Sequence, residues 1–172
     1  VMTVDGVLID ANIALGAAAN QGGAGIFNNG GTLNVVNGSV VSNNLSTGAA
    51  ASGGGLLSTT GAVTVSNSTF DSNSANRAGG AIELIDGTLD FTNSIMSNND
   101  VNGTAGPAAP GNGGGFHVTG MSGTINFTGS SIYGNEAANE GGGLWNQGGT
   151  TMNVMNSVLY DNSAGEGGAI YN

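Results

Sequence analysis

The sequence repeats a short pattern about six times, and this repetition restricts the fold more than any other feature. A glycine-rich tetrapeptide that ends in a large apolar residue begins at Gly23, Gly53, Gly79, Gly113, Gly141 and Gly167. Successive copies begin 26 to 34 residues apart. A period of this length is typical of solenoids, in which each repeat packs only against its neighbours.

Aligning the copies produces columns of apolar residues that alternate with polar ones. The first two columns are Met2, Leu33, Val63, Leu89, Ile125, Met152 and Val4, Val35, Val65, Phe91, Phe127, Val154. The third column is Ile9, Val40, Phe70, Met96, Ile132 and Leu159. Because a period of two indicates strands, we predict an all-β chain with three short strands per repeat. Stacked about 4.8 Å apart, these strands predict a right-handed parallel β-helix of about five to six coils, forming a single domain over residues 1–172.

A column of asparagines follows the third strand of each repeat. It consists of Asn12, Asn43, Asn73, Asn99, Asn135 and Asn162. Stacked asparagines bond to one another along an axis, so this column is predicted to be a structural ladder. Six residues before each stands a turn residue: Gly6, Asn37, Asn67, Asn93, Gly129 and Asn156. Glycine and asparagine both tolerate the left-handed conformation that a sharp corner requires.

The charge and residue usage exclude several classes of protein. The chain has a net charge of −10, with 11 acidic residues against Arg77, and it contains no lysine and no cysteine. A nucleic-acid partner is not expected, because binding requires a basic surface. Disulfides and thiolate zinc sites are excluded. No apolar run is long enough for membrane insertion by this segment.

The chain starts within a coil and stops within another, so we expect uncapped ends. Open ends expose unpaired strands. The segment is therefore predicted to belong to a longer solenoid or to be a fibre subunit, with other solenoid segments or copies of itself as partners.

The motifs resemble the GGAI and FxxN repeats of the chlamydial-type polymorphic outer membrane proteins. Gly79-Gly80-Ala81-Ile82 and Gly167-Gly168-Ala169-Ile170 match the first motif, and Phe70-Asp71-Ser72-Asn73 matches the second. The resemblance implies an extracellular location at a bacterial cell surface. It also implies the role of an autotransporter passenger and adhesin, with glycans or host and cell-surface proteins as partners. The chain has no translocator barrel and no cysteines, so it matches a passenger segment only.

One column is expected to face outward beside the glycine tetrapeptides. It contains Phe27, Leu57, Glu83, His117, Trp145 and Tyr171. We take Phe27, Glu83, His117, Trp145 and Tyr171 as candidate binding residues, since rings beside a shallow floor of small residues suit a sugar or a protein strand. The floor is expected to be the preceding column, Gly25, Gly55, Ala81, Gly115, Gly143 and Ala169. A carbohydrate-binding module is one alternative function, and a column that stacks only on itself is the simpler interpretation.

A second outward set is rich in threonine and asparagine, in pairs such as Thr124 with Asn126 and Thr151 with Asn153. A flat array of this kind is the basis of an ice-binding alternative, although threonine also suits any solvent-facing strand.

Catalysis and metal binding are not expected. A polyuronate lyase needs a basic residue, and Arg77 is the only arginine. A polysaccharide hydrolase needs two facing carboxylates, and Glu83 and Asp90 are predicted to lie on different faces. His117 lacks a serine or cysteine partner. Asn98, Asp100 and Asn102 resemble the start of a calcium loop, but Ala109 stands where the bidentate glutamate belongs. No cofactor is predicted beyond this weak indication of calcium near Asp100.

Overall fold

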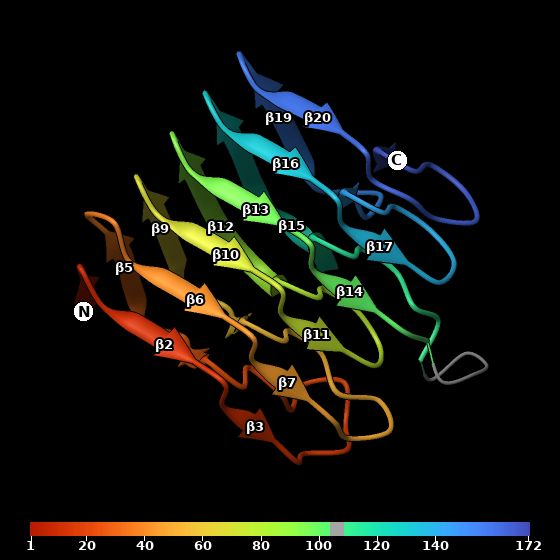
Figure 1. Cartoon of the computed structure of the whole chain (residues 1–172), viewed down its shortest axis with the longest axis horizontal. Coiled ribbons are helices and arrows are strands. Elements are labelled where there is room, and N and C mark those ends of the chain that lie inside the picture. The colour runs from red at the N-terminus through yellow and green to blue at the C-terminus, as the bar shows by residue number, and fades with distance from the viewer. Residues whose placement is uncertain (104–108) are drawn as a thin grey trace.

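The computed structural model describes residues 1–103 and 109–172, and within them the chain is an all-β solenoid of about six turns. All strand pairs within the described residues are parallel, and each strand pairs with its counterpart in the adjacent coil, on both sides for the inner coils. Figure 1 shows equivalent strands stacked in order from the N-terminus to the C-terminus. The predicted parallel β-helix is therefore confirmed. The described residues contain no helix of the length and apolarity needed to cross a bilayer.

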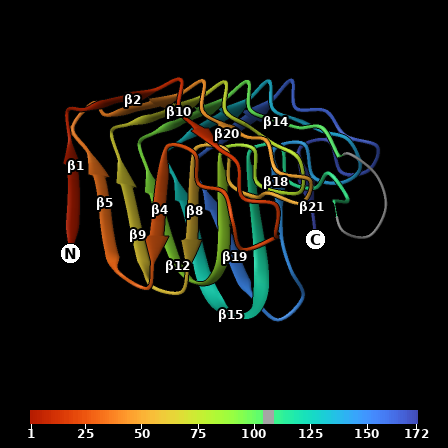
Figure 2. The ribbon, with the colours of Figure 1, turned by 90° about the horizontal axis from the view of Figure 1, so that it is seen from below.

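The largest sheet has ten strands and bends into two arms. In Figure 2 the chain runs down the first arm and returns along the second, as β4 and β5 show. Arm one contains β4 (Ile26–Asn29), β8 (Leu56–Thr59), the first parts of β12 (Ile82–Thr92) and β15 (Phe116–Thr128), β18 (Leu144–Trp145) and β21 (Ile170–Tyr171). Arm two contains β1 (Met2–Asp5), β5 (Thr32–Val36), β9 (Ala62–Ser66), the second parts of β12 and β15, and β19 (Thr151–Met155).

Two smaller sheets complete the tube. The second sheet has six strands: β2 (Leu8–Asp10), β6 (Val40–Ser42), β10 (Thr69–Asp71), β13 (Ile95–Ser97), β16 (Ser131–Tyr133) and β20 (Val158–Tyr160). The third sheet has five: β3 (Ile13–Ala14), β7 (Leu45–Ser46), β11 (Ser74–Ala75), β14 (Asp100–Val101) and β17 (Glu136–Ala137). The loops that connect this third sheet back to arm one are called the corner loops. In the second coil, the corner loop spans residues 47–52.

The core is built by stacking like residues on like. Leu33, Val63, Leu89 and Ile125 pair in register, and each is at most 1% exposed. Phenylalanines fill the centre: the ring centroids of Phe91 and Phe127 lie 5.6 Å apart. Because each coil alone buries little, this core exists only through stacking.

The corner between arm two and the second sheet uses left-handed residues, as predicted. Gly6, Asn37, Asn67, Asn93, Gly129 and Asn156 all have φ between 48° and 63°. A column of serines that was not predicted from the repeat lies directly after this corner: Ser39, Ser68, Ser94, Ser130 and Ser157. The Ser94 hydroxyl donates to Thr92 O at 2.7 Å and accepts from the Ser68 amide at 3.1 Å. This column therefore satisfies backbone groups that the corner would otherwise leave unpaired.

The asparagine ladder is confirmed, but the prediction that Asn43 belongs to it is wrong. Asn44, not Asn43, accepts from Asn12 Nδ2 at 2.9 Å and donates to Asn73 Oδ1 at 2.9 Å. Likewise Val41, not Val40, pairs with Phe70. The cause is an extra residue at the corner, where both Asn37 and Gly38 have positive φ. Asn43 instead lies at the next corner with φ 53°, and its amide donates to Asp10.

The glycine pairs are required because two backbones touch there. A Cβ at Gly80 would lie 2.2 Å from Gly114 O and 2.7 Å from Asp100 N. The following column, expected to be an outward floor, points inward instead. Ala81 is fully buried, and a Cβ at Gly55 would meet the Phe70 ring at 3.1 Å. The alternation of a strand breaks at this corner, so the prediction of a shallow floor is wrong.

Candidate functional site

The column from Phe27 to Tyr171 lies on the outer side of arm one, but the corner loops fold over it. Leu57 and Glu83 are fully buried and His117 is 3% exposed, whereas Phe27 is 52% exposed. The expectation that these side chains face solvent is therefore wrong for Leu57, Glu83 and His117. The arm directs them outward, and the loops between the third sheet and arm one cover them. We call Leu57, Glu83, His117, Trp145 and Tyr171 together the column site.

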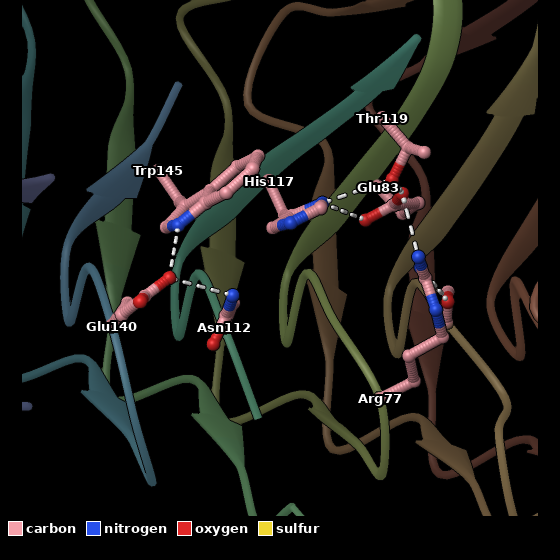
Figure 3. A network of polar contacts seen from close by, with 8 residues as sticks. Arg77, Glu83, Asn112, His117, Thr119, Glu140 and Trp145 are labelled. Atoms are coloured by element: carbon pink, nitrogen blue, oxygen red, sulfur yellow. Dashed lines mark hydrogen bonds and ion pairs between the residues drawn. The ribbon is translucent and has the colours of Figure 1, made fainter. Parts of the chain in front are cut away.

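Glu83 lies at the centre of a charged network within the column site (Figure 3). Its Oε2 lies 2.8 Å from Nδ1 of His117, but it accepts no hydrogen bond of good geometry within the described residues. Its Oε1 accepts from the Thr119 hydroxyl at 2.5 Å and lies 3.6 Å from Nη1 of Arg77. The same guanidinium donates to the Ser52 hydroxyl at 3.2 Å. The only arginine and the only histidine of the chain thus both contact its fully buried carboxylate.

Three rings continue the column toward the C-terminus. The rings of His117 and Trp145 stack 4.2 Å apart at 15°, and those of Trp145 and Tyr171 lie 6.1 Å apart at 4°. Sequence register explains this arrangement, because His117 pairs with Trp145 and Trp145 with Tyr171 on neighbouring strands. A sugar stacks on a free ring face. The neighbouring rings of His117 and Tyr171 therefore restrict a ligand's access to the faces of Trp145.

Glu140 ties the rings to the corner loop. Its Oε2 accepts from Trp145 Nε1 at 2.9 Å and from Asn112 Nδ2 at 3.0 Å, as Figure 3 shows. The negative charge of Glu140 raises the pKa of Tyr171 above its usual value of 10.0. Because Trp145 is held by its ring contacts with His117 and Tyr171 and by the hydrogen bond from its indole N–H, its side chain is fixed in one orientation.

Phe27 differs from the rest of the column. It lines a hollow of about 250 Å³ together with Ala14, Gly16, Asn20, Gln21 and Gly22. The Gln21 amide oxygen is already bonded to the Ala18 N–H at 3.1 Å, so the loop uses it to hold its own shape. The structure therefore brings Glu83, His117, Trp145 and Tyr171 together and leaves Phe27 apart from them, two coils away from Glu83.

Of the residues suggested for calcium, Asp100 and Asn102 lie together beside Ser74, but Asn98 lies apart from them. The Asn98 amide donates to Asp71, whereas Asp100 accepts from Ser74 at 3.4 Å on another sheet. Burial raises the pKa of Asp100, and the neighbouring Glu136 carboxylate raises it further. Within residues 1–103 and 109–172, no three acidic, histidine or cysteine side chains lie close enough to hold a metal ion.

Comparison with known proteins gives no relative. No protein-family model, curated protein or solved structure matches the chain. The column site therefore has to be interpreted from its own geometry. That geometry supports two chemical roles: an internal ion pair that fixes the corner loops, and a stack of rings that joins successive coils.

Proposed function

We propose that this chain is a stiff structural and adhesive segment of an extracellular or bacterial cell-surface protein. In this role the solenoid acts as a stalk or passenger that holds its corner loops and ladder faces away from the cell, where they contact other cells or matrix. The observation that carries the proposal is that one cross-section continues in register through about six coils, with the asparagine ladder and the core running along its length.

The polar groups that resemble catalytic residues support a non-catalytic role. Arg77 and His117 both contact Glu83, and Glu83 is fully buried. A buried carboxylate paired in this way serves the fold, because removing either partner leaves an uncompensated charge. Glycan partners remain part of the proposal through the loops and sheet faces, since the neighbouring rings restrict access to the faces of Trp145.

The surface charge agrees with display in an extracellular setting. Of the 11 acidic residues only Glu83 contacts Arg77, and the others leave the exterior acidic. A net charge of −10 makes the sides of neighbouring copies repel one another, which favours separate, unbundled stalks.

The proposal is tested by coating beads with the whole chain and measuring their retention on cell monolayers, matrix proteins and glycan arrays. We expect retention to fall when the corner loop 47–52 is replaced by the shorter loop 138–140. As a control, beads carrying a variant changed at the exposed Thr151 on arm two, away from the corner loops, retain binding. Beads that bind no more than uncoated ones on every surface contradict the adhesive role.

A further inference from the structure

The two ends of the solenoid present strand edges that are open to pairing. We call the edges of β1, β2, β3 and β4 the N-face and those of β19, β20 and β21 the C-face. Within the described residues, each of these strands pairs on one side only. Figure 1 shows β2 at one end of the stack and β20 at the other. Because an unpaired edge is a template for another strand, each face can accept a further coil.

Apolar residues that are buried in the inner coils are exposed on these faces. Met2 is 53% exposed, whereas its partner Leu33 in the second coil is fully buried. On the C-face Ile170 is 42% exposed, whereas its partner Leu144 is fully buried. Covering a face with another coil therefore removes apolar surface from water, which is the main favourable term in association.

The asparagine ladder gives the two faces opposite hydrogen-bonding character. In each joint between coils, the N–H and Nδ2 of one asparagine donate to Oδ1 of the next, as Asn135 does to Asn162 at 3.1 and 2.9 Å. On the C-face, the Asn162 N–H has no acceptor within the described residues, and Nδ2 donates only to Ile132 O. On the N-face, Asn12 Oδ1 has no donor within them. The C-face thus presents donors, and the N-face presents the matching acceptor.

Continuing the strand register by one coil brings matching residues of two copies together. In that register β19 meets β1, β20 meets β2, and β21 meets β4 of a second copy. Leu8 of the second copy then lies opposite Val158, and both are exposed in the single chain. Asn12 lies opposite Asn162, so the ladder continues from one copy into the next.

The same register keeps carboxylates apart, although the chain carries a net charge of −10. Three acidic residues of the faces meet uncharged residues of the other copy. The pairs are Asp5 with Met155, Asp10 with Tyr160, and Gly22 with Glu166. The charge that separates the sides of neighbouring copies therefore does not oppose contact at these positions of the ends.

The polarity of the faces selects one arrangement of copies. Two N-faces would bring ladder acceptors together, and two C-faces would bring ladder donors together, so neither pairing continues the ladder. A single peptide strand could pair with one sheet edge, but it would leave the edges of the other sheets open. A head-to-tail contact leaves one free face at each end, so it repeats without closing.

We propose that copies of this segment bind head to tail, with the C-face of one on the N-face of the next, and form a filament. The joint resembles the one between the first two coils, where β1, β2 and β4 pair with β5, β6 and β8. The match between the faces belongs to residues 1–172 as a unit, and it does not depend on what precedes or follows them in a longer chain. It goes beyond the stalk role, which needs no contact between copies.

The test follows the mass of the purified chain by sedimentation velocity and light scattering over a dilution series. A salt concentration of about 0.15 M screens repulsion between copies beyond about 8 Å. Electron microscopy of the concentrated samples measures the length and width of the particles. We expect the mass to rise with concentration and the particles to lengthen at constant width.

A charge pair placed across the joint separates this contact from other associations. Leu8 and Val158 lie in the first and sixth coils, about 24 Å apart in one chain at 4.8 Å per coil. Leu8→Asp and Val158→Lys each bury an unpaired charge, so each is expected to raise the concentration of half-assembly about tenfold. In the double variant the two charges meet across the joint, the net charge stays at −10, and assembly is expected to return to the parent's concentration.

Ile95→Asp and Ile95→Lys are the controls, because Ile95 lies in the same column, is also exposed, and belongs to the fourth coil. Both are expected to assemble as the parent does, and circular dichroism melts establish that all variants keep the fold. The proposal is overturned if the chain stays monomeric at every concentration or if its mass stops at two copies. It is also overturned if the double variant assembles no better than the single ones, or if the controls weaken assembly as much. Bead retention needs no contact between copies, so these outcomes leave the adhesive role to its own test.

Discussion

Removing one central asparagine from the ladder is expected to destabilise the solenoid strongly. The Asn99 side chain makes four hydrogen bonds: it accepts from the Asn73 amide and Nδ2 at 2.9 and 3.0 Å, and it donates to Phe70 O and Asn135 Oδ1 at 3.1 and 2.9 Å. Asn99 is fully buried, so Asn99→Ala leaves these partners without water to replace it. At about 1 kcal/mol per bond, the loss is about 4 kcal/mol.

The expected effect is large enough to separate from a control. For a chain of this size 4 kcal/mol corresponds to a fall in Tm of about 10 °C. Asn126→Ala removes the same side chain from the outward row on arm two, where water replaces the lost bonds to Asp90 and Asn153, and is expected to cost less than about 1 kcal/mol. Thermal melts by circular dichroism measure both variants, and hydrogen exchange at the Asn73 amide reports the lost acceptor locally. Equal shifts in Tm for the two variants would refute the reasoning.

Three further outcomes are expected. Asn44→Ala should lower Tm much more than Asn43→Ala, because Asn44 bonds within the ladder and Asn43 lies at an exposed corner; the reverse order would restore the register predicted from the sequence. Gly80→Ala should yield little folded protein, because the added Cβ meets backbone atoms, whereas Gly148→Ala, with open space around it, should express normally; soluble yields compare them. Burial raises the pKa of Asp71, but hydrogen bonds from Ser97, Asn98 and Ser72 outweigh this and lower the pKa below 3.8. The stability that Asp71 contributes is therefore present above the unfolded pKa and is lost as pH falls through the folded value, so Asp71→Asn should flatten that part of the pH dependence in urea titrations between about pH 5 and 2.

The parts of the fold that repeat could be predicted from one sequence, and the parts that depend on a single coil could not. Glycine anchors and apolar columns recur in every copy, so their alignment reveals the strands. The error at Asn43 came from Gly38, which adds one residue at the corner. Because of this extra residue, the sequence alone does not distinguish Asn43 from Asn44 as the ladder member. The serine column was missed although a serine follows the corner residue at Asn67, Asn93 and Asn156. Repetition of that dipeptide was the available signal.

The column site could not be predicted because its burial comes from loops that vary in length. Strand alternation correctly directs Glu83 and His117 away from the core, but alternation says nothing about what covers them. One signal was present: Arg77 and His117 are the only residues of their kinds, Arg77 stands six residues before Glu83, and His117 occupies the position of Glu83 in the next repeat. A buried carboxylate needs such partners, so their proximity in the repeat was the clue to an internal ion pair.

The residues of the column site determine the order of the coils, whereas those of the core do not. In the core one coil could replace another, because every coil supplies a similar apolar residue at each position. In the column site each residue matches a different neighbour: Glu83 pairs with His117, and His117 stacks on Trp145, which stacks on Tyr171. If the coils bearing Glu83 and His117 were separated, the ladder would persist while Glu83 lost the contact to its Oε2. The repeated residues therefore specify a solenoid, and the non-repeated column specifies which coil lies next to which.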